Sequence, residues 1–208
     1  MNPSPANSRA HRQAAHPALL KFRPHGTVRC SDDLPAFRNQ LARDLGCLLD
    51  VDEAVAAWCC RPSGMDRVLL DTGWKGSRPD FLVTYADGQQ FYLHATEGPG
   101  DPEVTEAAAC RGMRHRFVEA ADIRAGPRLQ NAQDLLRYAH VRAPLGDRMR
   151  ILAALEQEGF ASVADCMGLF REANPMAGLA SLILNRFVAI DLDVELIAPH
   201  TEVRLFRN

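Results

Sequence analysis

Two short apolar runs of the sequence carry side chains that could bind a divalent metal ion. Asp80 follows a proline and precedes "FLVTY", and His94 lies in the next run, "QQFYLHAT". The "ADG" between the runs predicts a β-hairpin. A metal-dependent nuclease hairpin holds Mg²⁺ with carboxylates and orients the attacking water, usually with a lysine. The second-strand acid and the lysine lie two residues apart, because residues i and i+2 of a strand share a face.

This chain has His94 and Thr96 at the positions for that acid and lysine. Imidazole is a softer donor that suits zinc or manganese better than magnesium, and a threonine carries no charge. Asp80, His94 and Glu97 could form a rebuilt site in an active endonuclease that uses Mg²⁺ or Mn²⁺. Glu97, however, is three residues from His94 and should face the other side of a regular strand. The other interpretation is a non-catalytic site that needs no cofactor. In that case His94 is a hydrogen-bonded residue of the sheet whose charge responds to Asp80.

The composition fits a globular protein with one domain or two small ones, since 47% of its 208 residues are apolar and 24% are charged. A net charge of −2 gives no overall attraction to nucleic acid. The charge is uneven, however, because the first 31 residues carry five basic side chains and no acid, and nine arginines lie between Ala107 and Arg150. Either segment could follow a phosphate backbone; the alternative is a solvated helix face and a disordered tail.

The six cysteines show no CxxC pair and no zinc-type spacing, and most lie in apolar patterns. This distribution indicates buried free thiols in a reducing compartment. No apolar run approaches the roughly 18 residues that would span a bilayer, and the N-terminus lacks a hydrophobic signal core. We therefore expect a cytoplasmic protein that makes no membrane contact.

Hydrophobic periodicity and turn residues predict an α/β/α layered domain over residues 31–140, after a flexible basic segment over 1–30. An amphipathic helix is expected over 34–50, capped by "SDD", and "RVLLD" is expected to form a strand. After the hairpin, Asp101 caps a helix that begins at Pro102 or Glu103 and carries "EVTEAAACRGMRHRFVEAA". "DIRAGP" then suggests a short strand or turn, and "LQNAQDLLRYAHV" another helix.

The pattern changes in residues 141–208. "PLGDRMRILAALEQEG" predicts a helix that stops at Gly159. "FASVADCMGLFREA" predicts a second, with Ser162 as its N-cap, and "NPMAGLASLILNRFVAI" a third that begins at Pro175. "DLDVELIAPHTEVRLF" alternates as two strands around a turn. Three helices followed by a β-hairpin predict a winged-helix domain.

Taken together, these segments resemble the TnsA family, the restriction-enzyme-like endonuclease subunit of heteromeric bacterial transposases. The resemblance covers about residues 31–208 and includes "NQLARDLGCLLDVDEAV", "RPDFLVTYADGQQFYLHAT", "LLRYAHV" and "LDVELIAPHTEVRL". Their order and spacing carry it, because no single segment is specific. It implies a PD-(D/E)xK nuclease core, that is, a restriction-endonuclease-like fold, followed by a winged-helix domain.

The same resemblance implies that the active site is degenerate. Asp80 corresponds to the metal-binding aspartate of the family, but His94 corresponds to its second acid and Thr96 to its lysine. Ala42 corresponds to the helical glutamate. Three of these four positions cannot perform the family's chemistry, so we expect a pseudo-nuclease without catalytic residues. Any remaining metal ligands would be Asp80 and His94.

A nuclease scaffold without catalysis could still bind DNA or a protein. The candidate DNA-binding residues are five arginines, of which the first two are expected near one helix face: Arg111, Arg114, Arg116, Arg124 and Arg128. The recognition helix expected in the winged domain has Arg186 as its only charge, so it fits a DNA major groove poorly. The resemblance implies a transposase subunit or an AAA+ ATPase regulator as protein partner, and transposition or control of a mobile element as the process.

Overall fold

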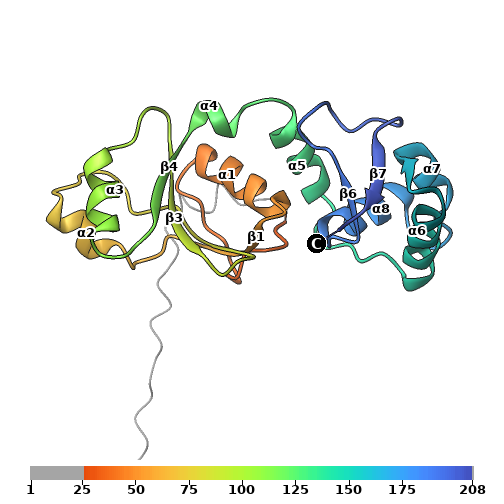
Figure 1. Ribbon diagram of the computed structural model, residues 1–208, viewed down its shortest axis with the longest axis horizontal. Helices are drawn as coiled ribbons and strands as arrows, with labels where there is room; N and C mark the ends of the chain where they lie inside the picture. The colour runs from red at the N-terminus through yellow and green to blue at the C-terminus, as the bar shows by residue number, and fades with distance from the viewer. Residues whose placement is uncertain (1–25, 208) are drawn as a thin grey trace, which may run out of the picture.

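The computed structural model of the protein describes residues 26–207 and has a mixed α/β fold (Figure 1). Most of the predicted flexible segment over 1–30 lies outside the described residues. Its predicted end at residue 30 is wrong, however. The backbone amides of Val28 and Arg29 donate to the Asp50 carboxylate, and Trp58 donates to the carbonyl of Arg29. The organised chain therefore begins before Ser31, because these residues pair with a strand that local sequence does not reveal.

Helix α1 (Gln40–Val51) is shorter than the helix predicted over 34–50. Asn39 is its N-cap and accepts a hydrogen bond from the amide of Ala42. The residues before it form bends. Pro35 gives a reason, because the residue before a proline is disfavoured in helical conformation.

The first sheet has four strands among the described residues: β1 (Val55–Cys60), β2 (Phe81–Tyr85), β3 (Gln90–Thr96) and β4 (His115–Glu119). They lie in the order β1-β2-β3-β4, antiparallel except for the parallel pair β3 and β4. The predicted hairpin of β2 and β3 is confirmed, and Gly88 has the positive φ of 80° that its turn requires.

Two predictions about the neighbouring elements are wrong. "RVLLD" lies in a helix, α2 (Asp66–Asp71), because periodicity alone does not separate a short apolar run of strand from one of helix. Helix α3 (Pro102–Ala109) starts at Pro102 with Asp101 as N-cap, as predicted, but ends before residues 115–119, which form β4. A parallel pair needs a crossover connection, and α3 supplies it.

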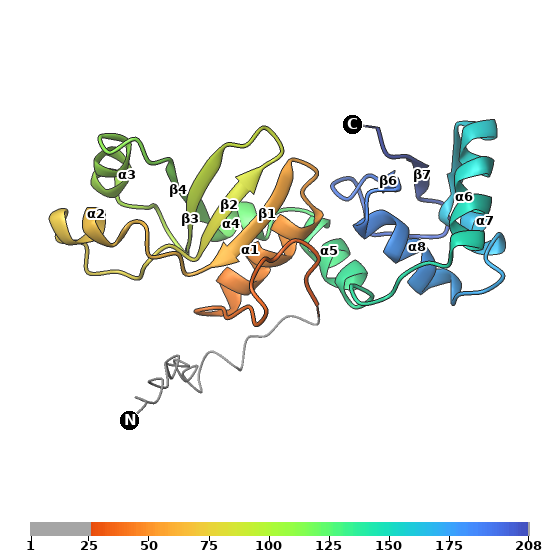
Figure 2. The same cartoon turned by 90° about the horizontal axis from the view of Figure 1, so that it is seen from below.

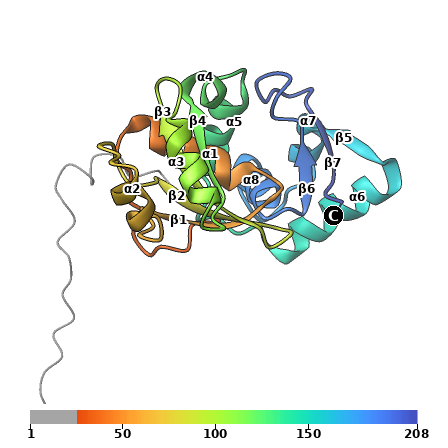
Figure 3. The same ribbon diagram turned by 60° about the vertical axis from the view of Figure 1, so that its left-hand side comes forward.

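Two further short helices complete the first part. Helix α4 (Ala120–Ile123) takes the first two residues of the expected strand or turn "DIRAGP", and the other four form a turn and bends. Helix α5 (Arg128–Leu136) confirms the next predicted helix. The sheet has helices on both faces. On one, α1 and α4 bury a core around Trp58, Phe81 and Leu93; on the other, α2 and α3 pack against Tyr92 and Phe117. Figure 3 turns the side with α2 and α3 toward the viewer.

The second part has the predicted order of three helices and a β-hairpin, but the predicted place of the first hairpin strand is wrong. Residues 188–190, expected at the end of the third helix, pair with residues 203–205 as that strand, and most of "DLDVELIAPH" forms the loop between the two strands. The second part consists of α6 (Leu145–Glu158), α7 (Val163–Gly168), α8 (Pro175–Leu184), β6 (Val188–Ile190) and β7 (Glu202–Leu205). A short strand that was not predicted, β5 (Phe160–Ser162), joins the hairpin in the order β5-β7-β6. Ser162 caps α7 in a capping box with Asp165, as the sequence indicates.

The two parts share a buried core in which α5 lies between α1 and α8 (Figure 2). The side-chain amide of Asn131 on α5 donates to the carbonyls of Leu192 (2.9 Å) and Glu195 (2.8 Å) and accepts from the amide of Ile197 (3.0 Å). In the opposite direction, Arg186 of the second part donates to the carbonyl of Asp52 in the first part (2.9 Å). The parts are thus held in a fixed relation by apolar packing and by buried polar contacts.

None of the helices within residues 26–207 is long and apolar enough to cross a membrane.

Candidate functional site

The Asp80 carboxylate is almost fully buried, with 3% of its surface exposed, and a guanidinium holds both of its oxygens. Arg38 donates from Nε to Oδ1 and from Nη2 to Oδ2, each at 3.0 Å. The backbone amide of Ala95 adds a third donor to Oδ2 at 2.9 Å, and Arg38 Nη2 also donates to the carbonyl of Ala95. Arg38 therefore joins the start of β2 to the end of β3.

The ion pair with Arg38 occupies the two Asp80 carboxylate oxygens that a metal ion would need. A bidentate guanidinium is a strong, geometrically specific partner for a carboxylate, and it supplies the positive charge that a divalent cation would otherwise bring. The hydrogen bond and the charge of Asp80 raise the pKa of Arg38, so the guanidinium stays protonated. For Asp80 to bind a metal ion through both carboxylate oxygens, Arg38 would have to leave.

His94 is also buried, and its two ring nitrogens are both hydrogen bonded. Nε2 lies 2.9 Å from the carbonyl of Ser77, which can only accept, so Nε2 carries the proton. Nδ1 then accepts from Nε2 of His115 at 2.7 Å, and Nδ1 of His115 accepts from the hydroxyl of Thr105 at 3.0 Å. The chain of hydrogen bonds fixes both tautomers and leaves His94 without a free lone pair for a metal ion.

The surroundings keep both imidazoles neutral. The His94 ring stacks on Phe117 with ring centres 5.0 Å apart, and Trp74 packs against its edge. Burial lowers the pKa of His94, and burial together with the neighbouring His94 lowers the pKa of His115 to about 4. His94 is thus a satisfied residue of the sheet, as one interpretation of the sequence expects, and Asp80 opposes part of its pKa shift.

The remaining predicted positions serve structural contacts. Ala42 is fully buried in the core between α1 and the sheet. The hydroxyl of Thr96 donates to the carbonyl of Gly98 at 2.8 Å, which stabilises the turn after β3. Glu97 points to the surface and pairs with Arg124 at 3.2 Å.

Within residues 26–207, the rebuilt trio does not assemble. The ligand atoms of Asp80, His94 and Glu97 do not lie within 4.8 Å of one another. Glu97 is instead occupied by its exposed ion pair with Arg124. The geometry therefore does not support a metal site built from these three side chains.

The five candidate DNA-binding arginines do not lie on one helix, and the expectation that Arg111 and Arg114 share a helix face is wrong. Arg111 follows the end of α3 and pairs with Asp71 of α2. Arg114 bonds to Gln89 and lies over the ring of Phe91, near the β2–β3 turn.

Of the other three arginines, Arg128 alone has a described contact with the second part. Arg116 is exposed on β4, Arg124 follows α4 and pairs with Glu97, and Arg128 begins α5 and pairs with Asp193 at 2.7 Å. Arg114 precedes the start of β4 and Arg124 follows its end, so the set is spread along the strand. Four of the five have polar or acidic partners that compete with phosphate.

Helix α8, the expected recognition helix, is largely buried. Seven of its ten residues are buried, and its Ala180 and Leu184 pack against α5 in the core shared by the two parts. The loop between β6 and β7 carries Asp191, Asp193 and Glu195 and has no lysine or arginine. Neither element presents the basic surface that DNA binding requires.

The sequence interpretation missed Arg38 and His115. Arg38 stands four residues before Ala42, so a basic residue one helical turn from the missing acid was the available signal. His115 lies in the segment "EVTEAAACRGMRHRFVEAA" that was expected to be one helix, and only its place on β4 puts it beside His94.

No protein-family model matches this sequence, and no curated protein is significantly similar to it. The resemblance to the TnsA family therefore stays a proposal.

Proposed function

We propose that the protein is a catalytically inactive, TnsA-like pseudo-nuclease that acts as a docking and DNA-associated accessory factor in a DNA transaction such as transposition. In this proposal the first part has the restriction-endonuclease-like fold and the second part is a winged-helix domain. The strand order β5-β7-β6 with three helices supports the latter, and the β2–β3 hairpin with α1 beneath it supports the former.

The observation that carries the proposal is the Arg38–Asp80 pair. The one family ligand retained in the sequence is held by a guanidinium and a backbone amide, while His94 is committed to Ser77 and His115. A hydrolytic site needs open coordination positions for water and substrate. These contacts favour a scaffold in which the residues at the catalytic positions make structural hydrogen bonds instead.

The second part fits a protein partner better than a DNA groove. Its helix α8 packs against α5, and the loop after β6 is acidic. Large apolar side chains are also exposed in the second part, at the start of α6 and on β5, namely Leu145, Met149 and Phe160. Exposed apolar groups suit a protein contact, and acidic ones repel phosphate. We therefore assign docking to the second part, and any DNA contact to the arginines of the first.

A cleavage assay on the full-length protein tests the central claim. Supercoiled and linear DNA are incubated with the wild type, with Asp80→Ala, and with the Asp80→Ala and His94→Ala double variant, in Mg²⁺ or Mn²⁺. We expect the wild type to cleave no more than either variant. Metal-dependent cleavage by the wild type that both variants lose by orders of magnitude would overturn the proposal and establish the active endonuclease instead.

A further inference from the structure

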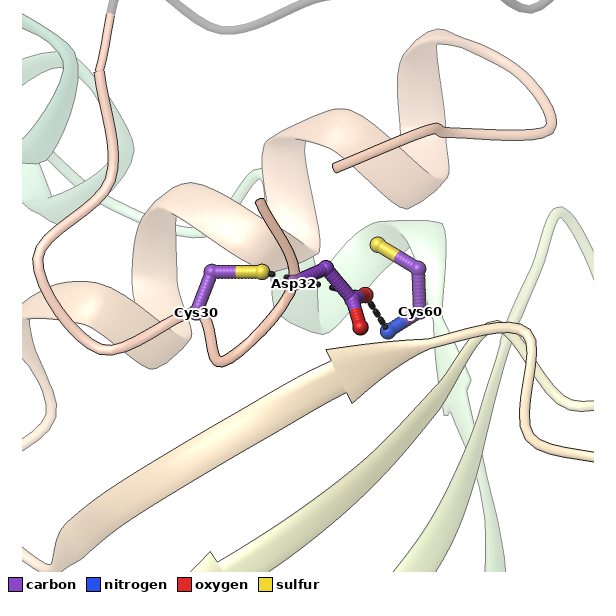
Figure 4. A group of neighbouring side chains, drawn as sticks. All are labelled: Cys30, Asp32 and Cys60. Carbon is purple, nitrogen blue, oxygen red and sulfur yellow. Dashed lines mark hydrogen bonds between the residues drawn. The ribbon is translucent and has the colours of Figure 1, made fainter. Parts of the chain in front are cut away.

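Three side chains from two distant segments converge at the β1 edge of the first sheet. Cys30 and Asp32 come from the extended segment before α1, and Cys60 is the last residue of β1. The thiol sulfurs and a carboxylate oxygen all lie within 4.8 Å of one another (Figure 4). The group is half-buried, so solvent and ions can reach it.

The backbone holds this arrangement in place. Cys30 forms a parallel bridge with Trp58, and the amide of Ser31 donates to the carbonyl of Trp58. The amide of Cys60 donates to Oδ2 of Asp32 at 2.6 Å, which orients the carboxylate. The same oxygen lies 3.9 Å from Sγ of Cys30.

We propose that Cys30, Asp32 and Cys60 form a site for Zn²⁺. Two thiolates and a carboxylate are ligands that zinc accepts, whereas magnesium and calcium prefer oxygen alone. With Zn–S bonds of about 2.3 Å, tetrahedral coordination places two sulfurs about 3.8 Å apart, so the side chains need to move by only about 1 Å. A water molecule would complete the tetrahedron.

Binding at this site must release protons. The neighbouring Cys30 and burial raise the pKa of the Cys60 thiol well above its usual range. Zinc binds the thiolate form, so its affinity should increase with pH.

The ion would tie the entering chain to the sheet close to the Arg38–Asp80 pair. Cys60 pairs with Phe81, the residue after Asp80, and Asp32 lies in the segment that leads to Arg38. The site would therefore fix the segment that delivers the guanidinium. This role is structural and does not depend on whether the protein binds or cleaves DNA.

Cobalt substitution in the reduced full-length protein tests the site, because Co²⁺ bound to thiolate gives a near-ultraviolet charge-transfer band. We expect one Co²⁺ per chain, displaced by Zn²⁺. Loss of a hydrogen-bond partner of a ligand weakens metal binding by roughly 10–100-fold. Cys30→Ser and Cys60→Ser each remove a ligand itself, so each should weaken Co²⁺ binding by more than that. Cys110→Ser, at an exposed cysteine outside the group, is the matched control and should bind as the wild type does.

Asp32→Asn keeps both thiols and changes only the carboxylate. It should retain the thiolate band and bind more weakly. Far-ultraviolet circular dichroism checks that every variant is folded. A second readout is the melting temperature, which Zn²⁺ should raise in the wild type and in Cys110→Ser but not in Cys30→Ser or Cys60→Ser. The site is refuted if no thiolate band forms, or if the band survives in both Cys30→Ser and Cys60→Ser.

Discussion

Arg38 and Asp80, 42 positions apart in the sequence, form a bidentate ion pair in which the carboxylate has 3% and the guanidinium 36% of its side chain exposed. The pair lies at the start of the β2–β3 hairpin, at the acid that the proposal takes for the retained residue of a nuclease motif. It is reinforced by the bonds of both partners to Ala95. The same geometry satisfies the buried carboxylate, because a buried charge needs a partner and further hydrogen bonds.

Removing Arg38 should therefore destabilise the protein. Arg38→Ala leaves the Asp80 carboxylate buried without its countercharge. Loss of one partner from a fully buried pair costs about 3–5 kcal/mol, and we expect about 2–3 kcal/mol here because water reaches part of Arg38. Urea denaturation measures the change. Arg67→Ala, which removes a well-exposed pair with Asp71, is the control and should cost less than about 0.5 kcal/mol.

The same variant tests whether Arg38 blocks a cation site. With the guanidinium removed, Asp80 is left with the amide of Ala95 as its remaining partner in this group, and a divalent cation could neutralise it. We expect Mn²⁺ to raise the melting temperature of Arg38→Ala more than that of the wild type. The double variant Arg38→Ala and Asp80→Asn should show no such gain. Equal responses of all three proteins would contradict this explanation of the pair.

The buried histidine pair should make part of the stability dependent on pH. Burial lowers the pKa of His115 from 6.5 to about 4. Between these two pH values, His115 is protonated in the unfolded chain and neutral in the folded protein. The contribution of neutral His115 is present above pH 6.5 and is lost as the pH falls toward 4. Over that range it amounts to about 3 kcal/mol.

His115→Gln isolates this contribution. The unfolding free energy of the wild type minus that of His115→Gln should decrease as the pH falls from about 7 to about 4.5. The difference is needed because Asp50 acts in the opposite direction: burial raises its pKa to about 6, which stabilises the fold as the pH falls. A pH-independent difference between the two proteins would show that His115 does not titrate as the structure implies.

Asn131 should couple the two parts of the molecule. Asn131→Leu removes the three hydrogen bonds of a buried side chain and leaves two carbonyls and an amide of residues 192–197 without their partner. We expect a loss of about 2–4 kcal/mol and a less cooperative urea transition. Gln130→Leu, at an exposed neighbour that bonds only to Asp134 on its own helix, should change stability little. Equal effects of the two substitutions would argue against this role.

Charge reversal should test the arginines of the first part. If they contact phosphate, Arg111→Glu with Arg114→Glu should weaken binding to a labelled duplex and reduce the slope of log affinity against log salt by about 1 for each lost contact. Arg171→Glu, an exposed position in the second part, is the matched control. Binding that is unaffected by the first pair, or a protein that binds no DNA, would leave docking through the second part as the function.

Local signals in the sequence were enough to predict several elements. The "ADG" turn defined the β2–β3 hairpin, Asp101 and Ser162 marked the starts of α3 and α7, and the order of three helices and a hairpin in the second part was correct. These signals work because turn and cap residues bond to backbone groups within a few positions. Where the signal was ambiguous, as in "RVLLD" or residues 115–119, tertiary packing decided between helix and strand.

The chemistry of the site depended on contacts that local patterns cannot specify. By itself, the sequence determined that Asp80 precedes one strand of a hairpin and that His94 and Thr96 lie on the next; that they replace the groups of a nuclease motif stays part of the proposal. Only the folded chain placed Arg38 on Asp80, His115 on His94, and Cys30 beside Cys60. Each of these partners is separated by 21 or more positions, and strand register and the crossover through α3 bring them together. Periodicity reports which face of an element is buried, whereas register decides which side chains meet across it.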